Sequence, residues 1–136
     1  MIRRNVTFEN GPPGWLLISQ VEHARLSGEI TRAWREPFSQ EVVDAIAHHD
    51  DGWSEWEASP QLDTARGRPL SFVEMPIAEA LQIWNRSIGD AHRIGLLAGA
   101  IVAGHFLGLA SGSDHAQKPL VAHWSRGWNI FRLAWM

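Results

Sequence analysis

The chain begins with two short runs of strand-forming residues, IRRNVTF (2–8) and WLLIS (15–19). The turn-forming segment ENGPPG lies between them. Branched and aromatic side chains favour strands, whereas Gly, Pro and Asn favour turns. The pattern therefore predicts an N-terminal β-hairpin. Such a hairpin must pack on the rest of the chain, because two strands alone are only marginally stable.

A helix is predicted for residues 20–34, with Ser19 as its N-cap. Apolar residues recur along this segment at helical spacing and form one stripe. The stripe also includes a histidine, and its members are His23, Leu26, Ile30, Ala33 and Trp34. We therefore expect His23 to face the core.

A second helix is predicted for residues 40–51, between the N-cap Ser39 and Gly52. At about 100° per residue, its buried side is formed by Val42, Val43, Ile46 and Ala47. The same geometry turns His49 and Asp50 toward that side, whereas Asp44 and His48 lie opposite. We expect His49 and Asp50 to be buried and His48 to be solvated.

The remaining sequence is predicted to be mostly helical. Residues 58–72 are rich in Pro, Gly, Ser and Asp and indicate a surface loop. Pro76 opens a helix over 77–88, and Asp90 is a candidate cap for an apolar helix over 94–110. Residues 111–136 comprise a loop and a tryptophan-rich segment. We predict a single domain, 1–136, of the mainly α class, with a short N-terminal β-hairpin.

The apolar segment 94–110 carries no formal charge, but we do not interpret it as a membrane span. A span needs roughly 20 apolar residues, and this segment is shorter and contains His105 and four glycines. A buried central helix whose glycines allow close packing explains it better. We therefore expect no membrane insertion.

Composition excludes several kinds of function. The 136 residues are 45% hydrophobic and carry a net charge of −3, so no basic surface for nucleic acid is expected. The chain has no cysteine, which excludes disulfides and thiolate metal sites. The N-terminal sequence MIRRNVTFEN does not look like a signal peptide, and we expect a cytoplasmic protein.

The sequence instead offers histidine and carboxylate ligands. A buried carboxylate such as Asp50 needs a cation, backbone N–H groups or a metal ion as partner. His23, His49 and Asp50 would form a mixed nitrogen and oxygen set for a divalent ion such as Mn, Fe, Zn, Ni or Mg. His105 is a candidate fourth ligand. Each histidine has an alternative interpretation as a core residue bonded to a backbone carbonyl.

Three neighbouring residues have candidate roles in the same site. Asp51 is a candidate catalytic residue, either as general base or by orienting a ligand, although it could be only a charge at a helix end. Trp53 and Trp56 could bind a substrate ring, but aromatic residues more often pack in a core. Motifs for dinucleotide, P-loop, serine-hydrolase or zincin sites do not occur in the sequence.

Four stretches of the chain carry a family resemblance: GWLLISQVEHARLSGEI, AIAHHDDGWSEWE, GRPLSFVEMPIAEALQIWNRSI and GLLAGAIVAGHFLGL. Together they cover about residues 2–109 and resemble a bacterial family catalogued as domain of unknown function 3891. The family is remotely similar to the HD superfamily of helical metal-dependent phosphohydrolases. That likeness implies an HD-like helical bundle in which His23 matches the first histidine and His49 with Asp50 match the His-Asp doublet.

Two departures from the family pattern concern the ligands. Ala80 stands where the family tends to have a histidine, and the resemblance implies a final aspartate in later helices. Asp114 is the only aspartate after Asp90. Residues 111–136 therefore do not look like the family segment that would carry this last ligand.

Three functions are compatible with the sequence. The first is a metal-dependent phosphohydrolase acting on a small phosphoester or nucleotide. The second is a catalytically degenerate module that binds a metal or small molecule. The third is a partner-binding protein, in which Trp124, Trp128 and Trp135 contribute to a homodimer interface.

Overall fold

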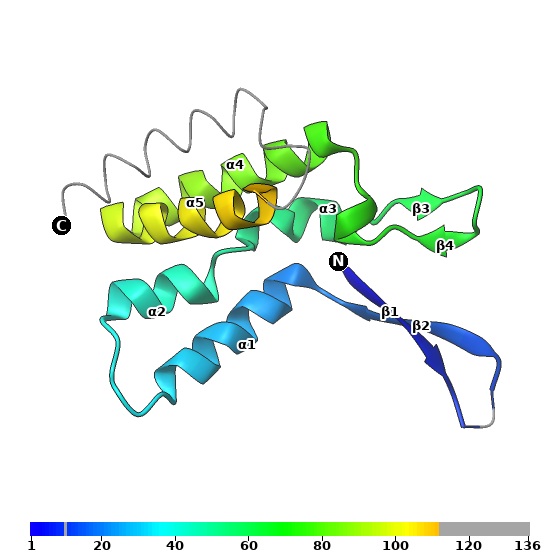
Figure 1. The fold of residues 1–136 in the computed structure, drawn as a ribbon, viewed down its shortest axis with the longest axis horizontal. Coiled ribbons are helices and arrows are strands. Elements are labelled where there is room, and N and C mark those ends of the chain that lie inside the picture. Colours follow the sequence, from blue (N-terminus) through cyan, green and yellow to red (C-terminus); the bar gives the residue numbers. More distant parts are fainter. Residues whose placement is uncertain (10, 112–136) are drawn as a thin grey trace.

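The structure is a computed structural model that describes residues 1–9 and 11–111. It opens with strands β1 (Ile2–Thr7) and β2 (Pro13–Ile18), which pair antiparallel from Ile2 opposite Ile18 to Thr7 opposite Pro13. The predicted hairpin is confirmed. It extends away from the helices at one end of the molecule (Figure 1).

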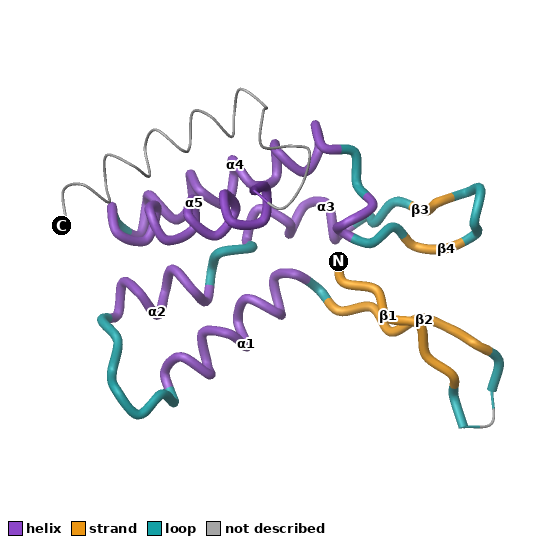
Figure 2. The backbone as a smooth tube through the Cα atoms, viewed as in Figure 1, coloured by secondary structure: helices purple, strands orange, loops and turns teal. Residues whose placement is uncertain are grey.

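Helices α1 (Gln20–Arg32) and α2 (Gln40–Ala47) follow the hairpin. Both predicted caps are present: the Ser19 hydroxyl accepts a hydrogen bond from the Glu22 backbone, and that of Ser39 accepts one from Val42. The two helices pack against each other and lie below the other long helices in the view of Figure 2.

The predicted buried face of α1 is wrong. The side of α1 that packs is formed by Gln20, Val21, Ala24 and Gly28. Leu26, Ile30 and Trp34 are 61%, 54% and 60% exposed, and His23 is exposed too. Small residues occupy the packed side because α2 approaches α1 closely at Gly28, which leaves no room there for the larger side chains.

The predicted second helix ends earlier than expected, at Ala47. The chain then forms a 3₁₀ helix, η1 (Asp51–Trp53), and the short helix α3 (Ser54–Ala58). The predicted loop contains strands β3 (Leu62–Asp63) and β4 (Arg68–Pro69), followed by a second 3₁₀ helix, η2 (Phe72–Glu74). Gly52 therefore lies inside η1 rather than at the end of α2.

Helices α4 (Ile77–Ile94) and α5 (Leu96–Ser111) are the longest and pack side by side (Figure 1). Asp90 is not the cap of the apolar helix, because α4 continues through it to Ile94. The Glu41 carboxylate of α2 instead accepts the backbone N–H groups of Leu97 and Ala98, at 3.0 and 3.1 Å. A Cβ at Gly95 would overlap this carboxylate, so a larger residue there would displace the Glu41 side chain from the cap.

The core lies between α4, α5, α2 and η1. Trp53 is 1% exposed, and Trp84 of α4 stacks on Phe106 of α5 with ring centroids 5.2 Å apart. The described part of the chain is mainly helical with a short N-terminal hairpin, as predicted. Within these residues, no helix is long and apolar enough to cross a membrane.

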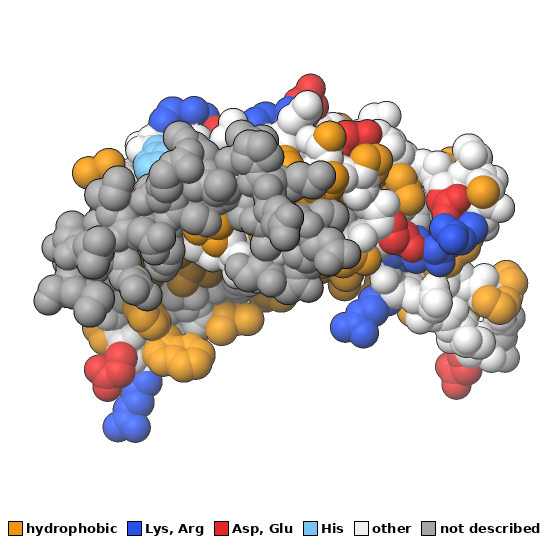
Figure 3. Space-filling model, turned by 45° about the horizontal axis from the view of Figure 1, so that its top comes forward, with side chains coloured by type: hydrophobic (Ala, Val, Ile, Leu, Met, Phe, Trp, Pro, Cys, Tyr) orange, Lys and Arg blue, Asp and Glu red, His pale blue; other side chains and the backbone are white. Residues whose placement is uncertain are grey.

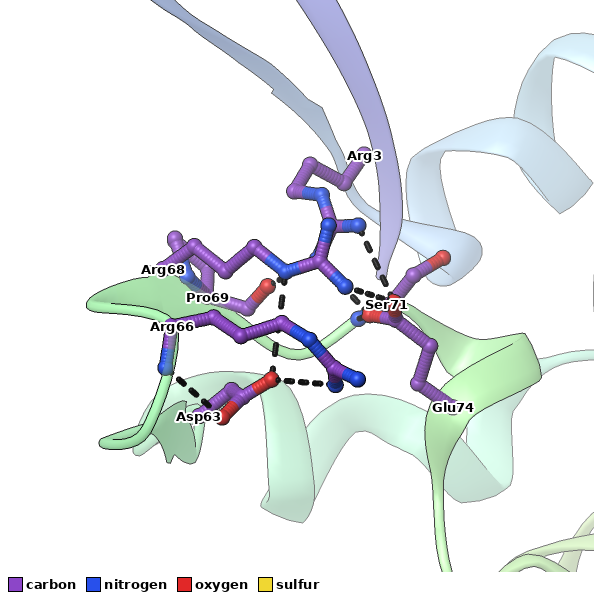
Figure 4. A network of polar contacts seen from close by, with 7 residues as sticks. All are labelled: Arg3, Asp63, Arg66, Arg68, Pro69, Ser71 and Glu74. Atoms are coloured by element: carbon purple, nitrogen blue, oxygen red, sulfur yellow. Dashed lines mark hydrogen bonds and ion pairs between the residues drawn. The ribbon is translucent and has the colours of Figure 1, made fainter.

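An ion-pair network joins the two hairpins (Figure 4). The Glu74 carboxylate binds the guanidinium groups of Arg3 and Arg68, at 2.7 and 2.6 Å, and Arg68 is also 3.9 Å from Asp63. These contacts hold the pKa of Glu74 well below its usual range, at about 2, mainly through the Arg3 hydrogen bonds. Acidic and basic side chains gather at this end of the molecule (Figure 3).

Candidate metal centre

The residues His49 and Asp50 lie in the non-helical link between α2 and η1. Both are buried, with 8% and 4% of their surface exposed, as the periodicity of the segment predicts. His48 and Asp50 have φ near −119° and −111°, with ψ near 10° and 14°. This sparsely populated region of backbone space is typical of turns, which these residues form, and it also recurs at active sites.

His23 of α1 completes a cluster with these two residues. One ligand atom from each of His23, His49 and Asp50 lies within 4.8 Å of the other two. The rings of His23 and His49 meet edge to face, with centroids 5.8 Å apart. Since His23 is exposed, the cluster has one side open to solvent and two buried ligands.

Hydrogen bonds fix the orientation of the His49 ring. Its Nδ1 lies 2.7 Å from the Ile46 carbonyl oxygen, and its Nε2 lies 3.2 Å from Asp50 Oδ2. Burial is the largest single influence and lowers the pKa of His49, but the Asp50 contact together with the Ile46 hydrogen bond and the Asp51 charge outweighs it, so the pKa is raised. When Nδ1 donates to the carbonyl, Nε2 is the atom that would bind a metal, in place of the proton that it shares with Asp50 in this structure.

His105 of α5 lies next to the cluster. Its ring meets that of His49 edge to face, with centroids 4.8 Å apart. His105 is exposed by surface area, but partial desolvation on its inner side and the neighbouring His49 lower its pKa, which favours the neutral imidazole that metals bind. The structure thus brings together all four residues predicted as ligands, with His105 beside the three-residue cluster rather than in it.

Asp51, the predicted catalytic residue, pairs with His48. Its Oδ2 lies 2.7 Å from His48 Nδ1, and both side chains are partly exposed. His48 therefore contacts a carboxylate at the surface rather than being a free solvated ring. The Asp51 carboxylate follows directly after Asp50 and has one side open to water.

The two tryptophans predicted to contact substrate pack together instead of lining an open surface. Their rings meet edge to face at 5.8 Å, and Trp53 also contacts Phe72. Trp53 is almost completely buried, so a ligand could not reach its ring without moving core residues. Both indole N–H groups are buried without an acceptor among the described residues.

Glu57 of α3 is a structural residue of the site that sequence reasoning missed. Its carboxylate accepts the Gln20 N–H at 2.7 Å and the Ser19 hydroxyl at 2.6 Å, and it lies 2.8 Å from the Met1 amino group. Burial raises the pKa of Glu57, but these contacts outweigh it and the pKa lies below 4.5. Glu57 fixes the start of α1, which carries His23. A glutamate repeated in the EWE stretch was the only sequence signal.

The donor set fits a divalent ion. Ligand atoms at about 2.0–2.2 Å from a tetrahedral ion lie roughly 3.3–3.5 Å from one another, and His49 Nε2 and Asp50 Oδ2 are 3.2 Å apart. The three ligand atoms of the cluster lie within 4.8 Å of one another, which is wider than this spacing, so one ligand must move slightly to bind the ion. The exposed His23 side chain can make that movement. Two imidazoles and a carboxylate suit Zn, Mn, Fe or Ni better than they suit Mg, which prefers oxygen ligands.

Several sequence predictions fall outside the described residues. These concern the atypical segment that contains Asp114 and the proposed interface residues Trp124, Trp128 and Trp135.

Comparison with known proteins identifies a family. No curated protein and no solved structure matches the chain. A family model described as protein of unknown function (DUF3891) matches residues 4–127. The match continues beyond residue 109, so part of the segment predicted to be atypical lies within it. The chain belongs to the DUF3891 family of proteins of unknown function.

Proposed function

We propose that this protein binds a divalent metal ion at His23, His49 and Asp50 and hydrolyses a small phosphoester or nucleotide. The observation that carries the proposal is the buried His49–Asp50 pair with His23 beside it. An interior carboxylate is costly without a cation, and His49 supplies one to Asp50 only while its ring is protonated. The three adjacent imidazoles repel one another in that form. A divalent ion stabilises both features at once.

Each residue has a defined part in the proposed chemistry. His49 binds through Nε2, because Nδ1 is directed at the Ile46 carbonyl, and Asp50 supplies an oxygen ligand. His23 binds from the open side, and His105 completes the shell or yields its place to water. A bound divalent ion lowers the pKa of water and polarises a phosphoryl oxygen.

Asp51 is the proposed catalytic carboxylate. It follows the ligand Asp50, is only partly buried and is held by His48. A carboxylate in this place accepts a proton from an attacking water molecule. The open side at His23 is where a small phosphoester would enter.

A second candidate function is a binding module without turnover. The absence of an evident last aspartate ligand in the sequence favours it. Such a protein would bind the metal through the same three residues, and it would not release phosphate.

The first experiment is elemental analysis of protein purified without chelator and without a histidine tag. We expect about one divalent metal per chain in the wild-type protein and loss of it in His49→Ala. His48→Ala is the matched control, because His48 lies next in sequence, partly exposed and outside the cluster, and it should keep the metal. Metal-free wild-type protein with an intact helical spectrum would refute metal binding.

The second experiment measures phosphate release from a panel of nucleotides and phosphomonoesters. We expect activity in the metal-loaded wild-type protein and a loss of about 100-fold or more in Asp51→Asn, which should retain its metal. Metal-loaded wild-type protein without any hydrolysis would support the binding module instead.

A further inference from the structure

The link that carries His49 and Asp50 is attached to α4, a helix that contributes no residue to the His23–His49–Asp50 cluster. The buried part of the attachment is a hydrogen bond in which the Gly52 backbone N–H donates to the Ser87 hydroxyl at 3.0 Å, and the Arg86 guanidinium also reaches the Gly52 carbonyl oxygen, at 3.5 Å. Ser87 is 0% exposed. No water competes for this contact, so it is a fixed point for the chain that follows Asp50.

The backbone at Gly52 packs directly against the backbone of α4. A Cβ at this position would lie 2.4 Å from the Ile83 carbonyl oxygen and 2.6 Å from the Ser87 hydroxyl. Real Cβ atoms do not approach this closely, so only glycine permits the contact. The glycine of the HDDGW stretch is thus explained by close approach to α4, since positive-φ backbone among the described residues is confined to Gly67.

This fixed point is connected directly to Asp50. The Trp53 N–H donates to the Asp50 carbonyl oxygen at 3.0 Å, which closes a turn around Gly52. On the other side, the His48 backbone N–H donates to the Asp44 carbonyl oxygen in the last turn of α2. Between these two anchors, His49 and Asp50 lie outside a regular helix, so their directions depend on how the anchors hold the link.

We propose that Ser87 is a positioning residue of the metal centre. It holds Gly52 against α4 and thereby keeps His49 Nε2 and Asp50 Oδ2 at a separation that a metal ion can bridge. The inference rests on the proposed metal site. Ser87 does not touch the ligands and acts only through the link.

A merely structural Ser87 would behave differently. Removing a buried hydrogen bond lowers the stability of any fold, with no effect on the metal affinity of the folded molecules. If Ser87 anchors the ligands, its removal lets the link that carries His49 and Asp50 adopt other conformations. The metal ion must then order this link as it binds, which weakens its binding. Loss of a group hydrogen-bonded directly to a metal ligand typically costs 10–100-fold in metal affinity. Ser87 acts one step further away, through Gly52, so we expect the lower end of that range.

The experiment measures Co²⁺ binding and its visible absorption spectrum in the full-length protein. The variant is Ser87→Ala, and the matched control is Ser71→Ala. Ser71 is also a buried serine whose hydroxyl accepts a backbone N–H, from Glu74, but it lies in the turn before η2. Circular dichroism checks that both variants are folded, and Ser87→Cys replaces Ser87→Ala if the alanine variant is not.

We expect Ser87→Ala to bind Co²⁺ at least tenfold more weakly, with a shifted or weakened visible band. Ser71→Ala should lose stability and keep the wild-type affinity and spectrum. If wild-type protein binds Co²⁺ and Ser87→Ala binds it equally with the same band, the positioning role is overturned and the metal site stands. If the wild-type protein binds no Co²⁺, the metal site and the role of Ser87 both fail.

Discussion

Gly28 of α1 and Ala47 of α2 are in such close contact that a Cβ added to Gly28 would lie 2.5 Å from the Cβ of Ala47. This crossing decides how near the two helices come to each other. His23 precedes it on α1, and His49 follows it just beyond α2. The separation of the predicted ligands therefore depends on a contact between two of the smallest residues in the chain.

The first prediction concerns this crossing. Gly28→Ala should destabilise the protein by a net of about 1–2 kcal/mol, because the added methyl group overlaps Ala47 and forces the helices apart, which costs up to about 3 kcal/mol. The gain in helix propensity, about 1 kcal/mol, is too small to compensate. Chemical denaturation measures the difference in the free energy of unfolding.

Gly89→Ala is the matched control for this change. Gly89 lies inside α4 with nothing within 4 Å of an added Cβ, so the same substitution should raise the free energy of unfolding by about 0.5–1 kcal/mol. Equal effects at the two positions would show that the crossing has room for a methyl group.

The second prediction is that metal stabilises the fold through Asp50. A ligand at 100 times its Kd stabilises the folded state by about 2.7 kcal/mol, so saturating Zn²⁺ or Mn²⁺ should raise the melting temperature by several degrees. Asp50→Asn should abolish that rise. Asp44→Asn, on α2 outside the cluster, should keep it. A rise that persists in Asp50→Asn would place the metal elsewhere.

The third prediction tests Glu57. Glu57→Gln should lower the free energy of unfolding by about 2–3 kcal/mol, because an amide cannot supply both acceptor oxygens to Ser19 and Gln20 at the buried start of α1. Glu55→Gln is the control from the same helix. Glu55 is 81% exposed and pairs with Arg86 at 3.3 Å, so its loss should cost less than about 1 kcal/mol. Similar values for both variants would contradict a structural role of Glu57.

The fourth prediction concerns pH and the network at Glu74. Its pKa is lowered to about 2 from 4.5, so the folded state favours the carboxylate. The resulting stability is fully present above about pH 4.5 and is lost as the pH falls toward 2.

Glu74→Gln should be less stable by about 1–2 kcal/mol at pH 7, and the difference from the wild-type protein should vanish near pH 2. Urea denaturation across this range measures it. Glu79→Gln, whose carboxylate contacts Gln61 in an exposed position, should show no such convergence. A difference for Glu74→Gln that stays constant down to pH 2 would argue against the ion pair as its cause.

The helix caps and the hairpin could be predicted because their signals are local. Ser19 and Ser39 each cap a helix through a backbone N–H only three residues away. The burial of His49 and Asp50 was predicted from periodicity, although the helix assumed for it ends at Ala47. The predicted burial is nevertheless confirmed, because α2 packs against α5 and its apolar side directs the residues that follow it toward the same core.

Long-range capping was beyond sequence reasoning. Asp90 is close in sequence to the start of α5, and yet Glu41 caps that helix from 56 residues away. Glu57 likewise accepts from the start of α1 across 37 residues. A carboxylate serves any helix start that the tertiary fold brings to it, and sequence distance does not reveal which one.

By itself, the sequence determined the local elements of this protein and the ligand types it can offer, because propensity, caps and periodicity act within a few residues. Which face of α1 is packed was decided only by the tertiary structure. The spacing of apolar residues pointed to Leu26 and Ile30, but close approach at Ala47 demands the small side, with Gly28. His23 consequently lies at the solvent side of the cluster, and the candidate site is open rather than enclosed.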